Sequence, residues 1–388
     1  MEIKNLKKAA NRILKAIKKK ERIILYGDAD LDGTTSVIIL KETIKNLGGN
    51  NTVIYFPDRE KEGYGINEIA LNYLKKFAPA LFLAFDCGIS NFKEVILAKK
   101  MGFEVIIIDH HEILDRLPKA SIIVDPKQKG DKYPFKELAN AGIAFKLSQV
   151  LLKEKFNQSL RKNFLELAAL ATIADSMPAE NENKTMIEEG LFSLENSWRP
   201  GIRAFLEMGF PEDYLNFRQK VFKIISLLNI RDVQNQLPAS FRLLTISSLK
   251  EAKEMVKSLS EKAVFRKQRI NEIIEQVEEK ILIEEEEPII FVGDDFWELT
   301  LLGPVASLIL QKYKKPVFLF KKDKNEAQGT IRTPNGVNSI ILLKKCKKYL
   351  LTYGGHPRAS GFRLKNENLE EFKECLIKNR VFVEQKRR

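Results

Sequence analysis

The sequence has few cysteines and few histidines. Its 388 residues contain three cysteines, Cys87, Cys346 and Cys375, and three histidines. Because the cysteines are odd in number and far apart, they argue against a secreted disulfide framework and predict a reducing compartment. No CxxC pair occurs, which argues against a structural zinc site of the finger kind.

Long hydrophobic runs are also missing. Apolar stretches such as residues 78–85 fall far short of the ~18 residues that a membrane span needs. The first 20 residues read as a lysine-rich amphipathic helix, without the apolar segment of a signal peptide. We therefore predict no contact with a membrane and a cytoplasmic location.

Basic residues exceed acidic residues. Lys plus Arg number 65 and Asp plus Glu number 52, which gives a formal net charge of +13. Such a surplus favours a polyanionic partner, since basic side chains that neutralise phosphates release condensed counterions. Solvated lysine-rich helix faces explain the same surplus equally well. The charge suggests nucleic acid but does not establish it.

Short apolar runs define the predicted fold class, which is α/β. They occur at 23–26, 52–56, 81–85, 105–108 and 122–124, separated by helical stretches, as is typical of buried parallel strands. Residues 249–283 form a long charged helical pattern without Pro or Gly. Runs around 289–292 and 316–320 then predict a second, smaller α/β domain, and the length of the chain agrees with at least two domains.

Aspartates follow the predicted strands. Asp28, Asp30 and Asp32 come after the first strand, and Asp86, Asp109 and Asp125 each follow a later strand. Open α/β sheets bind ligands at the carboxyl edge, and clustered acids repel one another unless a cation neutralises them. A metal site is the simplest explanation. Asp175 ends an apolar helix and is a candidate for one more ligand.

The aspartates of the first turn also resemble a calcium-binding EF-hand loop. That loop needs a bidentate Glu at its twelfth position, where this chain has Ile39, and a helix before it, where this chain has a predicted strand. The EF-hand interpretation is therefore rejected.

His110 and His111 are adjacent and directly follow a predicted strand. Imidazole mixed with carboxylates suits manganese, iron or zinc better than calcium. Two cations about 3.5 to 4 Å apart would acidify a bound water and clamp both oxygens of an in-line displacement at phosphorus. No protein nucleophile is then required, and no obvious Ser/His/Asp or Cys/His arrangement is present.

A third region, residues 354–361, combines glycines with basic residues. Gly354 and Gly355 let backbone N–H groups approach an anion, and His356 and Arg358 add charge. Arg332 is a second candidate phosphate ligand. A plain tight turn and an ordinary surface arginine are the alternatives, and the sequence leaves them open.

Several of these segments, taken together, resemble a known family. Residues 26–36, 85–89, 108–112 and 171–178 resemble four motifs of the DHH phosphoesterase superfamily, and residues 354–362 resemble the glycine-histidine motif of its associated domain. Segments 57–65 and 133–142 are similar to the RecJ family of single-strand-specific exonucleases. Tyr26, where many DHH phosphatases have a histidine, also favours RecJ.

The resemblance implies an arrangement of domains. A parallel-sheet DHH domain would span 1–190, a helical connector 191–287, and a DHH-associated α/β domain 288–388, with the active site in the groove between the two domains. The chain ends soon after the associated domain, so we expect a short form without the OB-fold that longer RecJ proteins use to hold single strands.

The resemblance also implies site residues. Two Mn2+ or Mg2+ ions would be held by Asp30, Asp32, Asp86, His110 and Asp175, with Asp28 among or beside these ligands and Asp109 close by. His110, His111 and Asp109 would be the catalytic residues, and His111 would orient a phosphate or stabilise developing charge. The implied substrate-binding residues are Arg59, Arg332, Gly354, Gly355, His356 and Arg358.

The implied reaction is hydrolysis of single-stranded DNA from the 5′ end, in DNA repair or recombination. DNA is preferred over RNA as substrate, and a replication or repair protein is a candidate partner. Two alternatives stay open: an oligoribonuclease or small-nucleotide phosphatase, and a noncatalytic replication-associated scaffold. Two segments depart from the family pattern, residues 228–231 and 297–299, and they put the grip on substrate in doubt.

Overall fold

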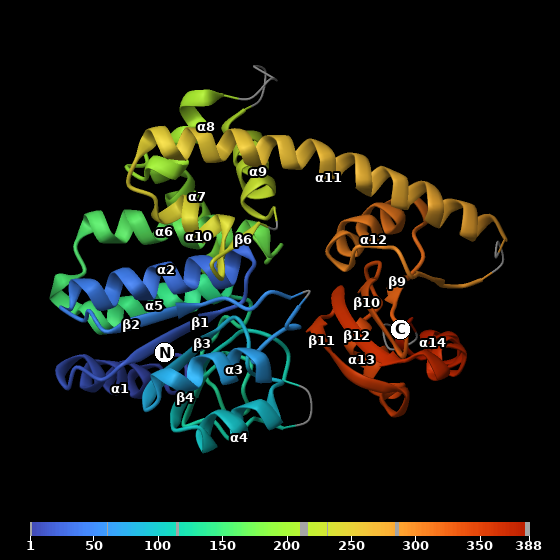
Figure 1. Cartoon of the computed structure of the whole chain (residues 1–388), viewed down its shortest axis with the longest axis horizontal. Helices are drawn as coiled ribbons and strands as arrows, with labels where there is room; N and C mark the ends of the chain where they lie inside the picture. The colour runs from blue at the N-terminus through green and yellow to red at the C-terminus, as the bar shows by residue number, and fades with distance from the viewer. Residues whose placement is uncertain are drawn as a thin grey trace. The chain divides into compact units, whose positions relative to one another are not determined.

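The computed structural model describes residues 2–59, 61–113, 116–209, 216–230, 232–283 and 287–384 (Figure 1). The chain divides into two compact units, Met1–Glu261 and Lys262–Arg388. The boundary falls inside helix α11 (Leu249–Ile283), whose bounds are those of the predicted long helix.

A parallel sheet forms the centre of the first unit. Its strands are β1 (Ile23–Gly27), β2 (Thr52–Tyr55), β3 (Ala80–Phe85), β4 (Phe103–Ile108) and β5 (Ile122–Val124). Their order is β2-β1-β3-β4-β5, and each neighbouring pair is parallel. All five predicted strands are confirmed. Strands β1, β3 and β5 are buried along their whole length, as expected for a sheet covered on both faces.

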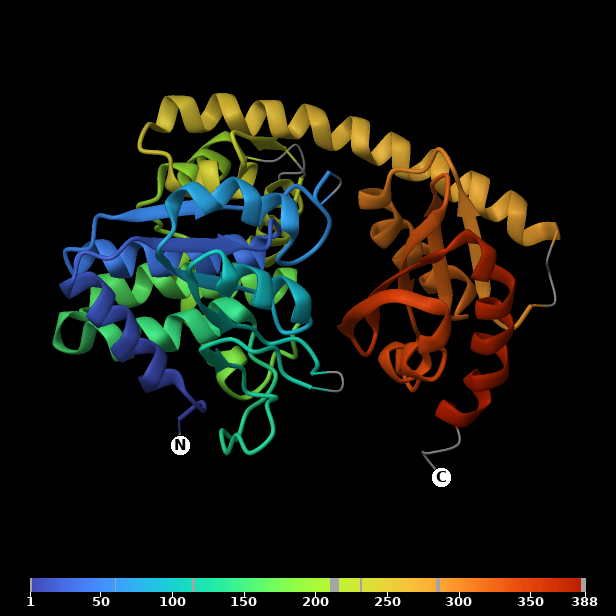
Figure 2. The same ribbon diagram turned by 60° about the horizontal axis from the view of Figure 1, so that its bottom comes forward.

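Helices cover both faces of this sheet (Figures 1 and 2). Helices α3 (Glu68–Leu74) and α4 (Phe92–Lys100) pack on one face through residues such as Leu71 and Val95. Helices α2 (Leu31–Asn46) and α5 (Asn140–Leu152) contact the strands from the other face, and α1 (Leu6–Lys18) packs on α5 and β5. Two 3-10 turns, η1 (Lys75–Phe77) and η2 (Lys153–Lys155), follow α3 and α5.

A further helical layer lies over α2 and α5. Its elements are α6 (Gln158–Ala174), α7 (Asn181–Leu194), α8 (Pro200–Met208), α9 (Phe217–Leu228), the β6 (Val233–Gln234) and β7 (Leu237–Pro238) hairpin, and α10 (Ala239–Thr245). Helix α6 packs on α2, and α10 packs on α2 and α8. The buried Arg199 guanidinium lies 2.9 Å from Glu42 of α2. Residues 191–261, which the sequence analysis assigns to a connector, are therefore part of the first unit.

The second unit contains a mixed sheet. Its strands are β8 (Ile290–Asp294), β9 (Val317–Lys322), β10 (Glu326–Arg332), β11 (Leu350–His356) and β12 (Ala359–Lys365). The order is β11-β12-β10-β9-β8; β8 and β9 are parallel, and the other pairs are antiparallel. The predicted runs at 289–292 and 316–320 correspond to β8 and β9.

Helices cover both faces of the second sheet as well. Helix α12 (Leu299–Tyr313) and the end of α11 share one apolar core with it, and α13 (Ser339–Lys345) and α14 (Leu369–Glu384) share the other. In Figure 2 the red helix α14 lies beside the orange and red strands. The 3-10 turns η3 (Lys347–Tyr349) and η4 (Asn366–Asn368) precede β11 and α14.

The structure pairs two of the three cysteines. Cys346, at the end of α13, forms a disulfide with Cys375 of α14, across 29 residues of sequence. This differs from the expectation of reduced cysteines. The pairing depends on α13 and α14 packing on the same face of the sheet, which the spacing of cysteines along the sequence does not show.

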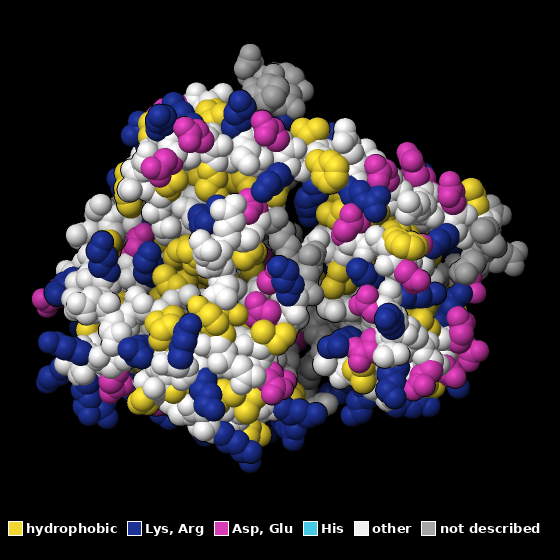
Figure 3. All heavy atoms as spheres, viewed as in Figure 1, with side chains coloured by type: hydrophobic (Ala, Val, Ile, Leu, Met, Phe, Trp, Pro, Cys, Tyr) yellow, Lys and Arg dark blue, Asp and Glu magenta, His cyan; other side chains and the backbone are white. Residues whose placement is uncertain are grey.

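The surface of Figure 3 carries Lys and Arg side chains interspersed with Asp and Glu. Within the described ranges, no helix combines the length and the apolar character needed to cross a membrane.

Candidate metal centre and phosphate-binding site

The order of the first sheet places strand-ending acids side by side. Strands β1, β3 and β4 are neighbours, and they are followed by Asp28, Asp86 and Asp109. Backbone hydrogen bonds continue between these positions: Asp28 N donates to Phe85 O at 3.1 Å, and Asp86 N donates to Ile108 O at 3.0 Å. The acids are therefore fixed by the sheet ladder itself.

The turn after β1 folds tightly onto the start of α2. Asp30 is the N-cap, and its Oδ1 accepts from Gly33 N at 3.1 Å. A Cβ atom at Gly33 would lie 2.4 Å from the Asp28 carbonyl oxygen, so only glycine fits this approach. The Asp-x-Asp-x-Asp-Gly spacing thus brings the three acids into one turn.

Asp32 is buried in the first turn of α2 and faces the start of α5. Its Oδ2 accepts from Asn140 N, and its Oδ1 accepts from Ala141 N, both at 2.7 Å. A helix N-terminus stabilises a carboxylate through these unsatisfied N–H groups. Sequence reasoning missed these backbone donors, although the Ala141-Gly142 pair within the similar segments marks their place.

His110 faces three carboxylates. Its Nε2 lies 3.1 Å from Asp86 Oδ1, and 3.6 Å from both Asp32 Oδ2 and Asp175 Oδ2. Its Nδ1 lies 2.9 Å from the Leu138 carbonyl oxygen, which can only accept, so Nδ1 carries the hydrogen. This orientation is the one in which Nε2 can bind a metal.

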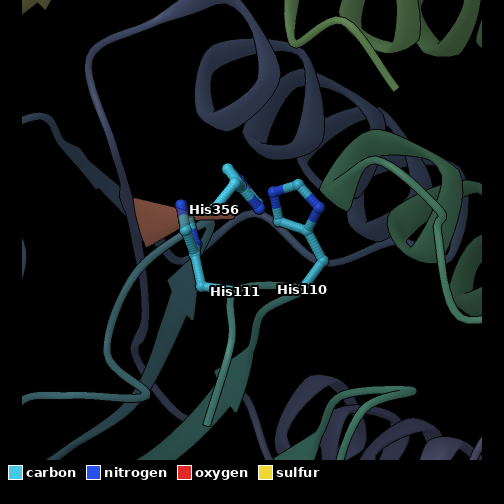
Figure 4. Close-up of side chains that lie close together, drawn as sticks. All are labelled: His110, His111 and His356. Carbon is cyan, nitrogen blue, oxygen red and sulfur yellow. The ribbon is translucent and has the colours of Figure 1, made fainter. Parts of the chain in front are cut away.

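His111 is held by Asp109. Asp109 Oδ1 lies 2.7 Å from His111 Nδ1 and accepts from His110 N at 2.8 Å, while Oδ2 accepts from Ile89 N at 3.0 Å. Burial lowers the pKa of His111, but the Asp109 carboxylate outweighs it and raises that pKa to about 9. Figure 4 shows the His110 and His111 rings rising side by side from the segment after β4, with centroids 4.8 Å apart.

Arg59 lies on the acids of the first turn. Its Nε donates to Asp28 Oδ1 at 2.8 Å, and its Nη2 contacts Asp28 Oδ2 and lies 2.9 Å from Asp30 Oδ2. Burial raises the pKa of Asp28 although Arg59 opposes it. For Asp30 burial is outweighed by Arg59 and the Gly33 N–H, and the pKa falls. Arg59 therefore engages both carboxylates, and these contacts do not favour one of the two as a metal ligand.

The ionised forms of the remaining acids are destabilised in the absence of a cation. Burial, followed by neighbouring aspartates, raises the pKa of Asp32 and Asp86 well above the usual range. Burial raises the pKa of Asp175 to about 7, with Asp30 adding to it. Asp86 has a left-handed backbone, with φ 61°, and its buried Oδ1 accepts no hydrogen bond from the described residues.

The donor set fits hard divalent cations. Potential ligand atoms lie within 4.8 Å of one another in three groups of the first unit. The groups are Asp32, His110 and Asp175; Asp28, Asp30 and Asp86; and Asp86, Asp109 and His111. Carboxylate oxygens with one or two imidazoles suit manganese and related ions, and the crowded acids gain a neutralising charge.

The strand-end pattern also includes Asp125, which is not among the predicted site residues. It is buried after β5, and its Oδ1 accepts from Lys127 N at 2.7 Å. Burial, reinforced by the Asp109 carboxylate, raises its pKa to about 8.

The substrate-binding candidates of the second unit gather at one end of its sheet. Arg332 ends β10 opposite Ala359, and His356 ends β11 opposite the same residue of β12. Arg358 lies in the turn between β11 and β12, and its carbonyl accepts from Thr333 N at 3.2 Å. Gly354 and Gly355 precede His356 in β11.

Two of these residues have local constraints that explain their identity. Gly355 has a φ of +127°, and a Cβ there would lie 2.6 Å from the Ala359 carbonyl oxygen, so a side chain is excluded. The Arg332 guanidinium donates to Thr330 Oγ1 at 2.9 Å and to Ser307 Oγ at 3.2 Å. The arginine is thus held at a fixed place and is not a freely rotating surface side chain.

The two departures from the family pattern have structural roles. Trp297 is fully buried, and its Nε1 donates to Gln276 at 2.7 Å, while Glu298 pairs with Arg269 at 2.8 Å. Leu228 and Ile230 are buried in the first unit. Asn229 is the C-cap of α9, and Arg231 lies outside the described residues.

Comparison with known families agrees with this fold. Residues 22–172 match the DHH family N-terminal domain, and residues 280–379 match the DHHA1 domain. The chain therefore carries a DHH domain in the first unit and a DHHA1 domain in the second.

Over nearly its whole length the chain is similar to RecJ exonucleases. It is 35% identical to the single-stranded-DNA-specific exonuclease RecJ of Bacillus subtilis (strain 168), over 97% of this chain and 48% of the relative. A crystal structure of exonuclease RecJ bound to manganese matches with a TM-score of 0.76 and 28% identity, covering 99% of this chain and 96% of that one. RecJ of Thermus thermophilus in complex with Mn2+ matches with a TM-score of 0.80 and 26% identity, covering 98% of this chain and 55% of that one. The chain thus spans about half the length of the B. subtilis protein.

Proposed function

We propose that this protein is a metal-dependent exonuclease that hydrolyses phosphodiester bonds of single-stranded DNA from the 5′ end, in DNA repair or recombination. The observation that carries the proposal is the set of buried carboxylates around His110 Nε2, from strand ends and helix ends. The similarity to RecJ exonucleases supports single-stranded DNA as the substrate. A cytoplasmic location and a replication or repair partner are part of the same proposal.

The residues that would hold two Mn2+ or Mg2+ ions are those that converge in the first unit. They are Asp30, Asp32, Asp86, His110 and Asp175, with Asp28 beside them. Two such ions, when bound, supply Lewis acidity that makes water a nucleophile at neutral pH and offsets charge at the phosphorus centre.

His111 supplies positive charge in this proposal. The Asp109 carboxylate raises the pKa of His111 to about 9, which favours the charged imidazolium, and it keeps Nδ1 fixed at 2.7 Å. A fixed cation beside the phosphate stabilises the negative charge that develops in the transition state. Asp109 acts through His111, because its oxygens are already engaged by Ile89 N, His110 N and the His111 ring.

The second unit supplies binding groups in this proposal. Arg332 and Arg358 carry charge, and the Gly354-Gly355 segment leaves the backbone of β11 without side chains beside them. Arginine forks match phosphate geometry, so these residues would bind the nucleic acid backbone without reading its sequence. In the first unit, Arg59 is the substrate-binding candidate.

The test follows mononucleotide release from a 5′-labelled single strand of about 20 to 30 nucleotides, a length longer than one strand-binding groove needs. We expect release that requires Mn2+ or Mg2+ and is lost in His110→Ala and Asp175→Ala. Cleavage of dinucleotides alone would replace the exonuclease with an oligonucleotidase. Binding of strands without any cleavage would support a noncatalytic scaffold.

A further inference from the structure

The Tyr64 hydroxyl contacts two residues of the metal centre, His111 and Asp86. Its oxygen is 3.4 Å from His111 Nε2 and 3.3 Å from the Asp86 carbonyl oxygen. The Tyr64 ring meets the His111 ring edge-on, with centroids 6.2 Å apart and planes at 74°. The Tyr64 side chain thus contacts both the His111 ring and the backbone of Asp86.

With Tyr64 in place, the His111 ring is held from both sides. Nδ1 lies 2.7 Å from Asp109, and Nε2 lies against the Tyr64 hydroxyl. Rotation of the imidazole about its bond to Cβ would lose both contacts.

The segment that carries Tyr64 is itself anchored to the sheet. Tyr26, fully buried in β1, donates its hydroxyl to the Gly65 carbonyl at 2.8 Å. Asn91 brackets Ile66, accepting from its N–H at 3.1 Å and donating to its carbonyl at 3.1 Å. The residue after Tyr64 is therefore tied to β1, and the one after that to the start of α4.

The Tyr64 ring also carries a cation on its face. The Arg59 guanidinium carbon lies 5.2 Å from the ring centroid, while the same guanidinium binds Asp28. Cation–π attraction of this kind favours the aromatic ring as well as the hydroxyl. Tyr64 is still 47% exposed, so its hydroxyl is not needed to fill the core.

We propose that Tyr64 is a positioning residue that fixes the His111 imidazole for its action on the scissile phosphate. The inference rests on the exonuclease function proposed above and adds to it a residue outside the DHH motifs. Tyr26 anchors the segment that presents Tyr64. The buried strand residue thus acts at a distance from the chemistry, through Gly65 and Tyr64.

Tyr64→Phe tests the role of the hydroxyl while keeping the ring. We expect kcat for mononucleotide release to fall about 10-fold, as for loss of one hydrogen bond that holds the ring, with KM changed by less than about twofold. Tyr73→Phe is the matched control, because Tyr73 is 43% exposed and belongs to α3 of the same unit. That variant should keep both constants.

Imidazole 15N NMR measures the environment of the His111 ring independently of turnover. The chain has three histidines, so the imidazole 15N signals of the Mg2+-treated protein can be assigned with His110→Ala and His356→Ala. We expect the His111 Nε2 signal to shift in Tyr64→Phe and to stay in place in Tyr73→Phe.

The outcomes distinguish failure of the Tyr64 positioning role from failure of the proposed exonuclease function. An unchanged kcat together with an unchanged His111 signal would overturn the positioning role, as would a rise in KM alone, which would make Tyr64 a substrate contact. If the wild-type protein releases no nucleotide with any metal, the proposed function fails. The His111 signal alone then decides whether Tyr64 holds the ring.

Discussion

Asp86 and Asp294 occupy similar places in the two units. Asp86 directly follows β3 of the first sheet, and Asp294 is the last residue of β8, a strand that pairs in parallel with β9. Asp294 lies 2.7 Å from Lys280 of α11, which neutralises it, and its pKa falls. Asp86 is surrounded by other acids, and burial raises its pKa well above the usual range.

The difference shows that a strand-ending acid is not by itself a site. In the first unit, three neighbouring strands each deliver an acid, and Asp32 and Asp175 arrive from helices α2 and α6. In the second unit, the neighbour β9 continues into lysines, Lys321 and Lys322. Convergence of several acids from separate elements, and not the local sequence, makes the first edge suited to cations.

The largest effect is expected from Asp86→Asn. The substitution removes a ligand charge from the centre of the acid cluster, so we expect nuclease activity to fall at least about 1000-fold and metal affinity to fall with it. Initial rates with Mn2+ and isothermal titration with Mn2+ measure the two effects.

Asp294→Asn is the control for that substitution. It removes only a partly exposed ion pair with Lys280, and such pairs contribute about 0 to 1 kcal/mol to stability. Activity should stay within about twofold of the wild-type value, because Asp294 belongs to the second unit and is not part of the acid cluster. Equal losses in both variants would mean that the two strand ends do not differ in function.

The next largest effect concerns stability in the second unit. Trp297 is fully buried and bonded to Gln276, whereas its neighbour Phe296 is 85% exposed. We expect Trp297→Ala to lower the free energy of unfolding by about 3 to 5 kcal/mol, and Phe296→Ala to change it by less than about 0.5 kcal/mol. Urea unfolding followed by circular dichroism measures both. Similar midpoints for the two variants would contradict the burial of Trp297.

Much of the first sheet could be predicted from the sequence because its signals are local. Apolar runs followed by Asp mark β1, β3 and β4, and the carboxyl-edge rule places the acids together. The backbone donors to Asp32 and the Leu138 carbonyl beside His110 could not be predicted, since every residue has these groups and only the packing of α5 selects them. The Cys346–Cys375 pairing likewise depends on where α13 and α14 pack.

Prediction from the sequence is weakest where one residue can serve either packing or binding. The departure from the family pattern in the segment 297–299 raises doubt about the grip on substrate, and the structure places Trp297 of that segment in the core with residues of α11 and α12. The family resemblance makes Arg59 a substrate-binding residue, and the structure places it on Asp28 and Asp30. In both cases the partner comes from another part of the chain, which a local pattern does not identify.

The smallest expected effect tests whether the second unit only binds phosphates while the first unit carries out the chemistry. Arg332 and Arg363 lie in adjacent strands of the second sheet, but Arg332 is held by Thr330 and Ser307 at the end of β10, while Arg363 is exposed and pairs with Glu326. If the second unit only binds phosphates, Arg332→Ala should raise KM about 10-fold with kcat nearly unchanged, and should reduce the salt dependence of binding by about one counterion.

Arg363→Ala is the control and should change neither KM nor the salt dependence, because an exposed ion pair to Glu326 contributes little. Steady-state kinetics on labelled single strands at several salt concentrations measure both variants. A fall in kcat of Arg332→Ala comparable to that of Asp86→Asn would place this arginine in the chemical step, and the division of labour between acids in one unit and arginines in the other would then be wrong.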